Sequence, residues 1–231
     1  MLAYCSGIFP MADRRDDPDI FWVEPRQRAI LPLNGFHVSR SLARTLRRGR
    51  FTVTCNEAFP EVIEACAQPR LGADGESWIS LRIQASYEKL HELGRAHSIE
   101  CWQTGEDGAR ELVGGLYGVG FSRVFCGESM FSRVPDSSKV ALAWLVAALR
   151  RCRAELLDCQ FITPHLATLG AEEISQQRYV SLLKAAQRPY SDEAAALALP
   201  EGFGALLDDA EAAGFASSPG KLIAQLLTQT S

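Results

Sequence analysis

The succession of strands and helices predicted for the second half of the chain constrains its fold more than any other feature. Three segments are typical of consecutive strands, "HSIECWQ", "ELVGGLYGVGF" and "RVFCGE", and the turn "TGEDG" joins the first two. They are followed by the strongly apolar helix "DSSKVALAWLVAALRRC", the strand "ELLDCQF" and the helix "SQQRYVSLLKAAQ". A mixed sheet with helices packed against it satisfies this order, so we expect an α+β fold.

The first 95 residues predict a smaller α+β unit. "IFWVE", "AIL" and "FTVTC" read as extended segments, while "AFPEVIEACA" and "WISLRIQASYEKLHELG" read as helices. The helix "SRSLARTLRRGR" has Ser39 as a candidate N-cap and Gly49 at its end. We therefore expect an N-terminal α+β domain over 1–95, a second domain over 96–188, and an Ala-rich, acidic, partly helical C-terminal tail over 189–231.

Glycines interrupt one of the predicted strands. The segment "GGLYGVG" matches neither GxGxxG nor a phosphate-binding P-loop, because its spacing and the element that follows it differ. Glycine inside a strand is instead typical of a bulge or of a close approach by a ligand.

The composition excludes several classes of protein. The seven cysteines are scattered and include no CxxC pair, which predicts neither a disulfide framework nor a zinc site. No apolar run approaches the roughly 18 residues of a membrane helix. The N-terminal segment lacks the basic and apolar regions of a secretory signal. We expect a cytoplasmic protein that binds no metal and no membrane.

Charge is unevenly distributed along the chain. From Tyr190 to Ser231 there are six acidic residues and one Lys, a charge of −5, which leaves +1 for residues 1–189 out of the total of −4. Arg40, Arg44, Arg47 and Arg48 fall near one face of a predicted helix. This face is either an ordinary solvated surface or a cationic surface for a nucleic-acid backbone.

The strand "ELLDCQF" ends with an unusual set of polar side chains. Asp158 and Gln160 are two residues apart and share one face, whereas Cys159 points to the other side and is the expected core residue. A carboxamide cannot act as an ordinary base, but its carbonyl oxygen can accept a hydrogen bond from an incoming amine. Such a pair suits a reaction in which positioning lowers the barrier. Alternatively, Asp158 caps the following turn and Gln160 is half exposed.

A longer set of segments resembles one protein family. "GIFPM", "FWVEPRQRAILPL", "FHVSRSLAR", "LHELGRAHSIECW", "LVGGLYGV", "FCGESMFSR", "SSKVAL", "LLDCQF" and "HLATLGAEEI" occur in one order over roughly residues 4–185. Together they resemble the leucyl/phenylalanyl-tRNA–protein transferases. The resemblance implies that Leu, Phe or sometimes Met is moved from aminoacyl-tRNA (Leu-tRNA or Phe-tRNA) to the N-terminal Arg or Lys of a protein, which marks that protein for N-degron degradation.

The resemblance also implies a structure and a set of partners. It predicts a GNAT-like catalytic domain over 96–188 after the smaller N-terminal domain. The aminoacyl ester already carries the activation, so the resemblance implies no cofactor. We expect a monomer whose binding partners are aminoacyl-tRNA and acceptor proteins or peptides.

The site residues follow by matching positions. The resemblance implies that Asp158 and Gln160 are the catalytic pair, Asp158 orienting Gln160 and Gln160 aligning the attacking amine. Trp78 matches a position that packs against the terminal adenosine of the tRNA, whereas Met11 stands where relatives often have Trp. The expected pocket for the transferred side chain, with Glu128 and Ser129 beside it, is formed by Leu116, Phe125, Gly127, Leu142 and Leu157.

Three other interpretations use the same residues. A CoA-dependent N-acyltransferase would need a pyrophosphate loop of the R/Q-x-x-G-x-G/A type, which the sequence lacks. Cys159 and His165 could form a thiol nucleophile and its base, although strand parity argues against it. A non-catalytic tRNA- or degron-binding relative would hold aminoacyl-tRNA without consuming it.

Overall fold

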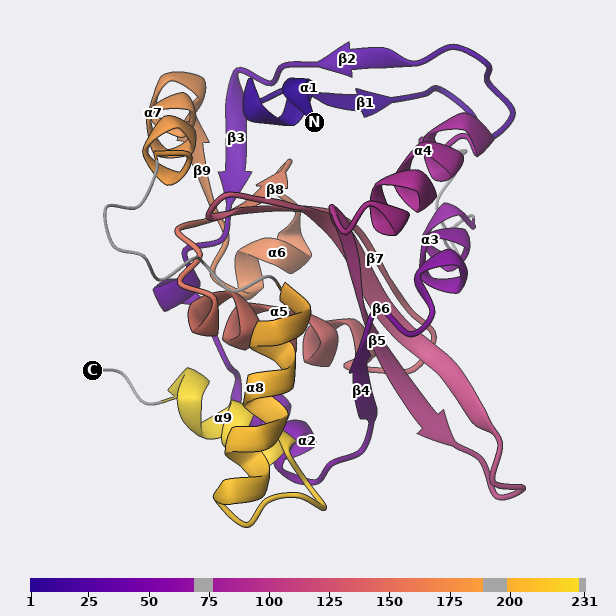
Figure 1. Ribbon diagram of the computed structural model, residues 1–231, viewed down its shortest axis with the longest axis vertical. Coiled ribbons are helices and arrows are strands. Elements are labelled where there is room, and N and C mark those ends of the chain that lie inside the picture. The colour runs from indigo at the N-terminus through magenta and orange to yellow at the C-terminus, as the bar shows by residue number, and fades with distance from the viewer. Residues whose placement is uncertain (69–76, 189–198, 229–231) are drawn as a thin grey trace.

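A seven-stranded mixed sheet forms the centre of the protein (Figure 1). The computed structural model describes residues 1–68, 77–188 and 199–228. Along the sheet the order is β4-β5-β6-β7-β8-β3-β9, and within it only β7 and β8 run parallel. The strands are β3 (Gln27–Ile30), β4 (Thr52–Cys55), β5 (Ala96–Thr104), β6 (Arg110–Phe121), β7 (Val124–Ser132), β8 (Leu156–Gln160) and β9 (Glu172–Ser175).

Helices cover both faces of this sheet. Figure 1 shows α3 (Phe59–Ala67) and α4 (Leu81–Glu92) on one side, and α5 (Ser137–Arg151), α8 (Leu199–Ala212) and α9 (Gly220–Thr228) on the other. Side chains of α2 (Arg40–Arg47) join the core under α5, whereas α1 (Leu2–Cys5) and α7 (Gln176–Ala186) contribute to the core on the opposite face. Each face therefore has its own apolar core. The remaining elements are β1 (Phe9–Met11) and β2 (Phe21–Val23), which form a two-stranded ribbon, the 3-10 turn η1 (Leu33–Gly35) and α6 (Pro164–Thr168).

Most of the predicted elements are confirmed. The Ser39 hydroxyl accepts a hydrogen bond from the Leu42 amide at 3.2 Å, and Gly49 adopts a left-handed φ of 59° just beyond α2. The short strands β1 and β9 were not expected, and the predicted loop at 69–77 falls almost wholly outside the described residues. No helix in the described part of the chain is long and apolar enough to cross a membrane.

The two expected domains share the central sheet. Strand β4 pairs with β5, and β3 pairs with β8, so strands from 1–95 hydrogen-bond to strands from 96–188. The division near residue 95 remains a prediction.

The glycines of β6 coincide with an irregular ladder. Tyr117 lies opposite Ser129, but the next residue, Gly118, lies opposite Gly127. Glu128 is therefore the extra residue of a bulge, a feature that re-aims side chains. A Cβ at Gly118 would approach the Cys126 carbonyl oxygen to 2.2 Å, so only glycine fits there. The bulge expected at "GGLYGVG" lies in the paired strand β7, opposite these glycines, and the close approach of a ligand stays a prediction.

The described part of the C-terminal tail packs on the body of the protein. Phe203 of α8 lies against Trp144 of α5, with ring centroids 5.0 Å apart. Helix α9 packs on α2, where the Ser218 hydroxyl donates to the Arg47 carbonyl at 3.1 Å. The tail thus completes the core under α5.

Two glycines of α8 allow a matched test of this packing. A Cβ at Gly202 would lie 2.2 Å from the Cys152 sulfur and 3.1 Å from the Ala148 carbonyl, whereas a Cβ at Gly204 meets nothing within 4 Å. We expect Gly202→Ala to lower the free energy of unfolding by about 1–3 kcal/mol through overpacking. Gly204→Ala should raise it by up to about 1 kcal/mol through helix propensity. Urea denaturation measures both, and equal effects would contradict a close α8–α5 contact.

Candidate active site

A buried ion pair lies at the centre of the candidate site. Arg28 of β3 donates from Nε to Asp158 Oδ1 at 2.8 Å and from Nη2 to Oδ2 at 2.5 Å, and both side chains are buried. Its Nη1 donates to the Gly7 carbonyl at 3.0 Å, and its guanidinium lies over the rings of Phe9 and Tyr179. Burial works to lower the pKa of Arg28, but the hydrogen bonds and charge of Asp158 raise it above its usual value. The guanidinium of Arg28 therefore stays charged.

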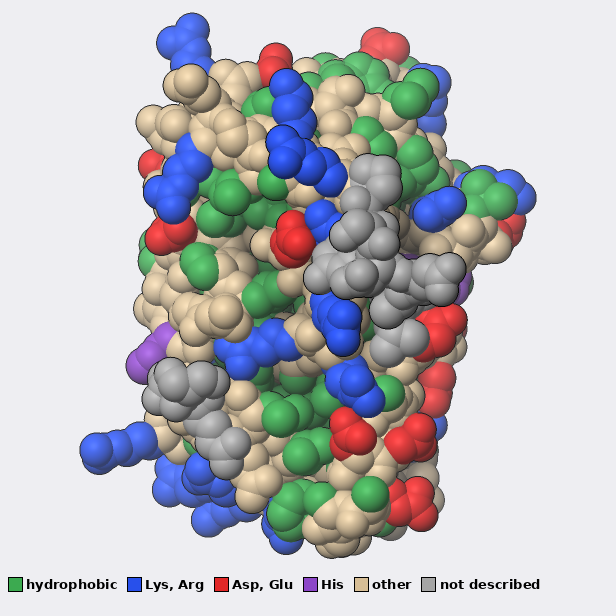
Figure 2. Space-filling view, turned by 60° about the vertical axis from the view of Figure 1, so that its left-hand side comes forward, with side chains coloured by type: hydrophobic (Ala, Val, Ile, Leu, Met, Phe, Trp, Pro, Cys, Tyr) green, Lys and Arg blue, Asp and Glu red, His purple; other side chains and the backbone are tan. Residues whose placement is uncertain are grey.

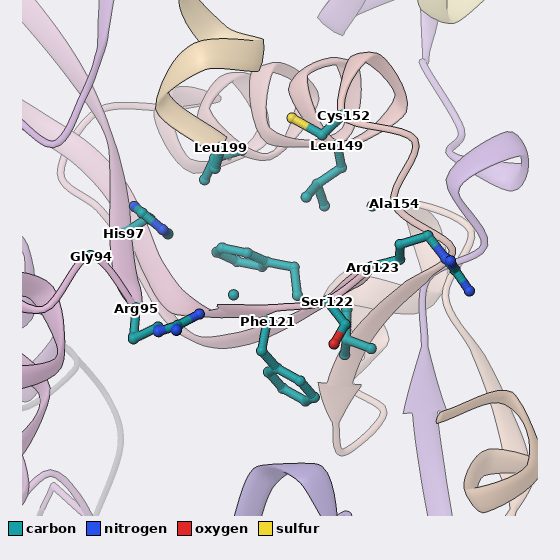
Figure 3. Close-up of a pocket in the computed structure, with 13 residues that line it drawn as sticks. Gly94, Arg95, His97, Phe121, Ser122, Arg123, Leu149, Cys152, Ala154 and Leu199 are labelled. Atoms are coloured by element: carbon teal, nitrogen blue, oxygen red, sulfur yellow. The ribbon is translucent and has the colours of Figure 1, made fainter. Parts of the chain in front are cut away.

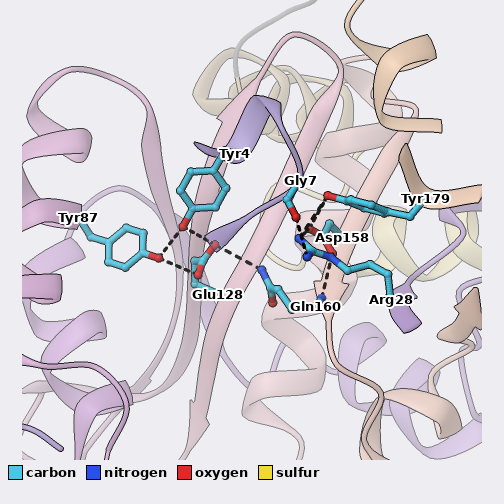
Figure 4. A network of polar contacts seen from close by, with 8 residues as sticks. All are labelled: Tyr4, Gly7, Arg28, Tyr87, Glu128, Asp158, Gln160 and Tyr179. Carbon is cyan, nitrogen blue, oxygen red and sulfur yellow. Dashed lines mark hydrogen bonds and ion pairs between the residues drawn. The ribbon is translucent and has the colours of Figure 1, made fainter. Parts of the chain in front are cut away.

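Asp158 reaches Gln160 through the backbone. Its Oδ1 accepts the Gln160 amide N–H at 2.9 Å, and its Oδ2 accepts the Tyr179 hydroxyl at 2.9 Å (Figure 4). Gln160 has a φ of 56°, a left-handed conformation that non-glycine residues rarely adopt. We expected Asp158 to hold the side-chain carboxamide of Gln160. In the structure Asp158 accepts a hydrogen bond from the backbone amide of Gln160 instead. Arg28, Tyr179 and a backbone amide already occupy the carboxylate, and Asp158 fixes the backbone turn instead.

The carboxamide of Gln160 donates to Glu128. Gln160 Nε2 lies 3.3 Å from Glu128 Oε1, a long hydrogen bond between β8 and the bulge of β7. The last paired residues of these parallel strands are Cys126 and Asp158. Glu128 lies two residues beyond Cys126, and Gln160 lies two residues beyond Asp158. Glu128 and Gln160 therefore meet where the ladder stops.

Two tyrosines close a ring around Glu128 (Figure 4). Tyr4 of α1 donates to Oε1 at 2.9 Å, Tyr87 of α4 donates to Oε2 at 2.8 Å, and the two hydroxyl oxygens lie 2.5 Å apart. Burial raises the pKa of Glu128 to about 7, against the hydrogen bonds from both tyrosines, which lower it. Some exposure of Glu128 remains. The expected cost of burying this carboxylate is thus met by three donors.

The other predicted site residues lie in three groups. The apolar pocket residues Leu116, Phe125, Leu142 and Leu157 are all buried in the core under α5. Gly127 and Ser129 flank Glu128 in β7. The amide of Ala12 donates to the Trp78 carbonyl at 3.2 Å, which brings the strand of Met11 beside Trp78.

Arg40, Arg44, Arg47 and Arg48 are exposed on α2, while Leu42 and Leu46 are buried. Figure 2 shows Lys and Arg side chains gathered at the lower end of the molecule, the end at which α2 lies in Figure 1. Asp and Glu side chains gather separately at the lower right of the same view. The basic surface is therefore open on this face.

A separate cavity of about 370 Å³ opens at the start of β7 (Figure 3). Arg95 and His97 reach toward it, and Leu149 and Cys152 at the end of α5 line its other side. Burial lowers the pKa of His97 to about 4, so this imidazole is neutral at pH 7. The cavity is distinct from the network around Glu128.

A thiol nucleophile at Cys159 is disfavoured. Burial raises the pKa of this thiol well above its usual value, aided by the charge of Asp158, which keeps it protonated. His165 is exposed on α6. Among the described residues, no group of three or more His, Cys, Asp or Glu side chains could hold a metal ion.

Sequence reasoning missed four residues of the network. Arg28, Tyr4, Tyr87 and Tyr179 come from four different elements, and the first lies 130 positions from Asp158. Of these four residues, only Arg28 could have been identified from the sequence, because an arginine within the apolar segment "QRAIL" requires a buried partner. Tyr87 and Tyr179 stand in ordinary helical patterns, and no element was predicted at Tyr4.

The chain matches known proteins over nearly its whole length. Residues 30–184 match the family described as Leucyl/phenylalanyl-tRNA protein transferase, and residues 1–26 match the N-terminal domain of the same family. A leucyl/phenylalanyl-tRNA–protein transferase from Novosphingobium aromaticivorans is 64% identical, over 99% of this chain and 94% of that protein. Similar proteins of the same name from Zymomonas mobilis and Rhizorhabdus wittichii are 53% and 55% identical, over 81% and 80% of this chain and 68% and 72% of theirs.

The mixed sheet, its polar network and these matches define an enzyme of the transferase class. The chain belongs to the leucyl/phenylalanyl-tRNA–protein transferase family. The match to the Novosphingobium relative extends over the C-terminal helices.

The buried ion pair predicts strong coupling between β3 and β8. Arg28→Met or Asp158→Leu alone leaves one buried charge unpaired, so each should lower the free energy of unfolding by about 3–5 kcal/mol. The double variant Arg28→Met/Asp158→Leu removes both charges and should cost less than either single change. Guanidinium denaturation of the three variants measures the coupling, and additive costs would contradict it.

The raised pKa of Glu128 predicts a pH-dependent stability. The folded protein binds this proton more tightly than the unfolded chain, whose ordinary value is 4.5 against about 7 in the fold. The stabilisation is complete below about pH 4 and is lost as pH rises through 7. From pH 4.5 to 7.5 we expect the unfolding free energy of the wild type to fall by about 3 kcal/mol relative to Glu128→Gln. Urea denaturation across this range measures it; a constant difference would argue against the shift.

Proposed function

We propose that the protein transfers Leu or Phe, and sometimes Met, from aminoacyl-tRNA to the N-terminal Arg or Lys of acceptor proteins. Membership of the leucyl/phenylalanyl-tRNA–protein transferase family carries this proposal. The new peptide bond marks the acceptor for N-degron degradation. The protein acts as a monomer in the cytoplasm, where charged tRNA and newly exposed N-termini occur together.

The reaction needs positioning more than activation. The aminoacyl ester is already an activated acyl donor, and the α-amine of the acceptor attacks its carbonyl carbon while the terminal ribose of the tRNA leaves. Gln160 Nε2 donates to Glu128, so the carboxamide oxygen remains to accept a hydrogen bond from the attacking amine. Asp158 sets the backbone turn that aims this side chain. Asp158 is thus a positioning residue, and Gln160 is the catalytic one.

The sheet supports a GNAT-like description of the catalytic domain over 96–188. Strands β7 and β8 run parallel, pair as far as Cys126 and Asp158, and then separate. Because the pairing of β7 and β8 ends there, Glu128 and Gln160 lie at the point where the two strands separate. In this proposal the acyl donor and the amine meet at that point.

Three surfaces bind the aminoacyl-tRNA in this proposal. The arginines of α2 bind its phosphates without reading sequence, which predicts binding that weakens with salt. Trp78 packs against the terminal adenosine, and Met11 covers it from the neighbouring strand. The transferred side chain enters the apolar region formed by Leu116, Phe125, Gly127, Leu142 and Leu157, with Glu128 and Ser129 at its edge.

The direct test is transfer of radiolabelled Leu or Phe from charged tRNA to a peptide that begins with Arg. We expect transfer by the wild type and none to the same peptide beginning with Glu. Gln160→Ala should lower the single-turnover rate about 10²-fold, the usual cost of losing one positioned hydrogen-bonding group, and keep tRNA affinity. Gln176→Ala, which removes a surface carboxamide paired with Glu24, is the matched control. No transfer by a folded wild type that still binds tRNA would indicate a non-catalytic binder.

A further inference from the structure

The ring of Tyr4, Tyr87 and Glu128 contains more close contacts than its tyrosines have protons. Three pairs of oxygens lie within hydrogen-bonding distance, at 2.5, 2.8 and 2.9 Å. Each contact needs one proton, and two phenols supply two. With Glu128 ionised, both phenols donate to the carboxylate, and their own oxygens are left 2.5 Å apart with no proton between them. A carboxylic acid supplies the missing proton.

A protonated Glu128 satisfies every contact in one direction around the ring. In this state the contact between Oε2 and Tyr87 is reversed relative to the ionised form: Oε2–H donates to Tyr87, Tyr87 donates to Tyr4, and Tyr4 donates back to Oε1. The Gln160 amide donates to the same Oε1 at 3.3 Å. The ionised form also keeps three donors, from Tyr4, Tyr87 and Gln160. The site is therefore built to hold Glu128 in either state, which is what a proton-exchanging group requires.

We propose that Glu128, with its proton shared by Tyr4 and Tyr87, takes up the proton that the acceptor amine releases during transfer. This inference rests on the proposed function. The acceptor enters as an ammonium and ends as an amide N–H, so it gives up two protons. One goes to the ribose oxygen as the ester C–O bond breaks and the C–N bond forms. The other converts the Glu128 carboxylate into the acid, the state in which each of the three ring contacts carries a proton.

The surroundings of Glu128 allow both states near neutral pH. Burial raises its pKa to about 7 and Asp158 raises it further, while the hydrogen bonds from the two tyrosines and the charge of Arg28 lower it. That value is close to the typical pKa of about 7.7 for an α-amine, so proton transfer between them is nearly balanced. The titratable groups facing Glu128 from the packed elements are Tyr4 on α1, Tyr87 on α4, Tyr117 on β6, Cys126 on β7, Asp158 on β8 and Arg28 on β3.

The test is the pH profile of single-turnover transfer to an Arg-peptide between pH 5.5 and 8.5. We expect the wild-type rate to rise with pH through two inflections, one from Glu128 near 7 and one from the acceptor amine. Glu128→Gln keeps the ring, because its amide donates and its oxygen accepts, but it cannot take a proton. It should lose the lower inflection and transfer about 10²-fold or more slowly. Glu128→Gln with the wild-type rate and profile would overturn the proposal.

The tyrosines provide a readout that a merely structural role would not move. Tyr87→Phe and Tyr4→Phe each remove a donor to the carboxylate, so each should shift the lower inflection to higher pH. Tyr117→Phe is the matched control: its ring packs on Tyr87, but its buried hydroxyl makes no hydrogen bond within the described structure. It should leave the profile unchanged. An unshifted inflection in both ring variants would overturn the proposal.

An infrared measurement separates this proposal from the proposed function. The free wild type at pH 6 should show a protonated-carboxyl band that is absent from Glu128→Gln and fades by pH 8. A missing band at pH 6 in a protein that transfers Leu would overturn the proton site alone. A wild type that shows the band but transfers neither Leu nor Phe at any pH would overturn transfer and proton uptake together.

Discussion

The buried pair of Arg28 and Asp158 is the interaction on which the rest of the site depends. It joins β3 to β8 with two charge-assisted hydrogen bonds, and neither side chain has access to water. Burying two charges is costly, and only complete pairing offsets the loss of solvent. Here each of the three guanidinium nitrogens donates a hydrogen bond, to Asp158, to the Gly7 carbonyl or to Tyr179. The N-terminal segment is thereby attached to the sheet.

That attachment brings the proton-sharing ring together. Gly7 follows α1, so the hydrogen bond from Arg28 to its carbonyl holds Tyr4 near Glu128. On the other side of the pair, Asp158 holds the Gln160 amide and stabilises its left-handed backbone. Two irregularities, the bulge at Glu128 and the turn at Gln160, then meet where β7 and β8 stop pairing. A regular parallel ladder would point neither side chain toward the other.

Local patterns explain which parts of this could be read from the sequence. The Ser39 cap, the apolar α5, the irregular ladder beside the glycines of β6 and the exposed arginines of α2 all follow from spacings within about ten residues. Asp158 and Gln160 followed from their spacing at the end of a predicted strand, and the family motifs added Glu128. Their contacts did not: strand parity paired Asp158 with Gln160 on one face, whereas the positive φ at Gln160 turns its side chain to Glu128.

By itself, the sequence determined the kind of elements, their order and the family, because periodicity, caps and motifs are properties of neighbouring residues. Only the tertiary structure decided which side chains share a proton. Tyr4 contacts Tyr87, which is 83 positions away in the sequence, and Glu128, which is 124 positions away. Arg28 contacts Asp158, which is 130 positions away. These contacts depend on the strand order β7-β8-β3 and on the packing of α1 and α4 beside these strands. Burial and charge pairing in the folded state determine which of these distant side chains come into contact, and a local sequence pattern does not predict them.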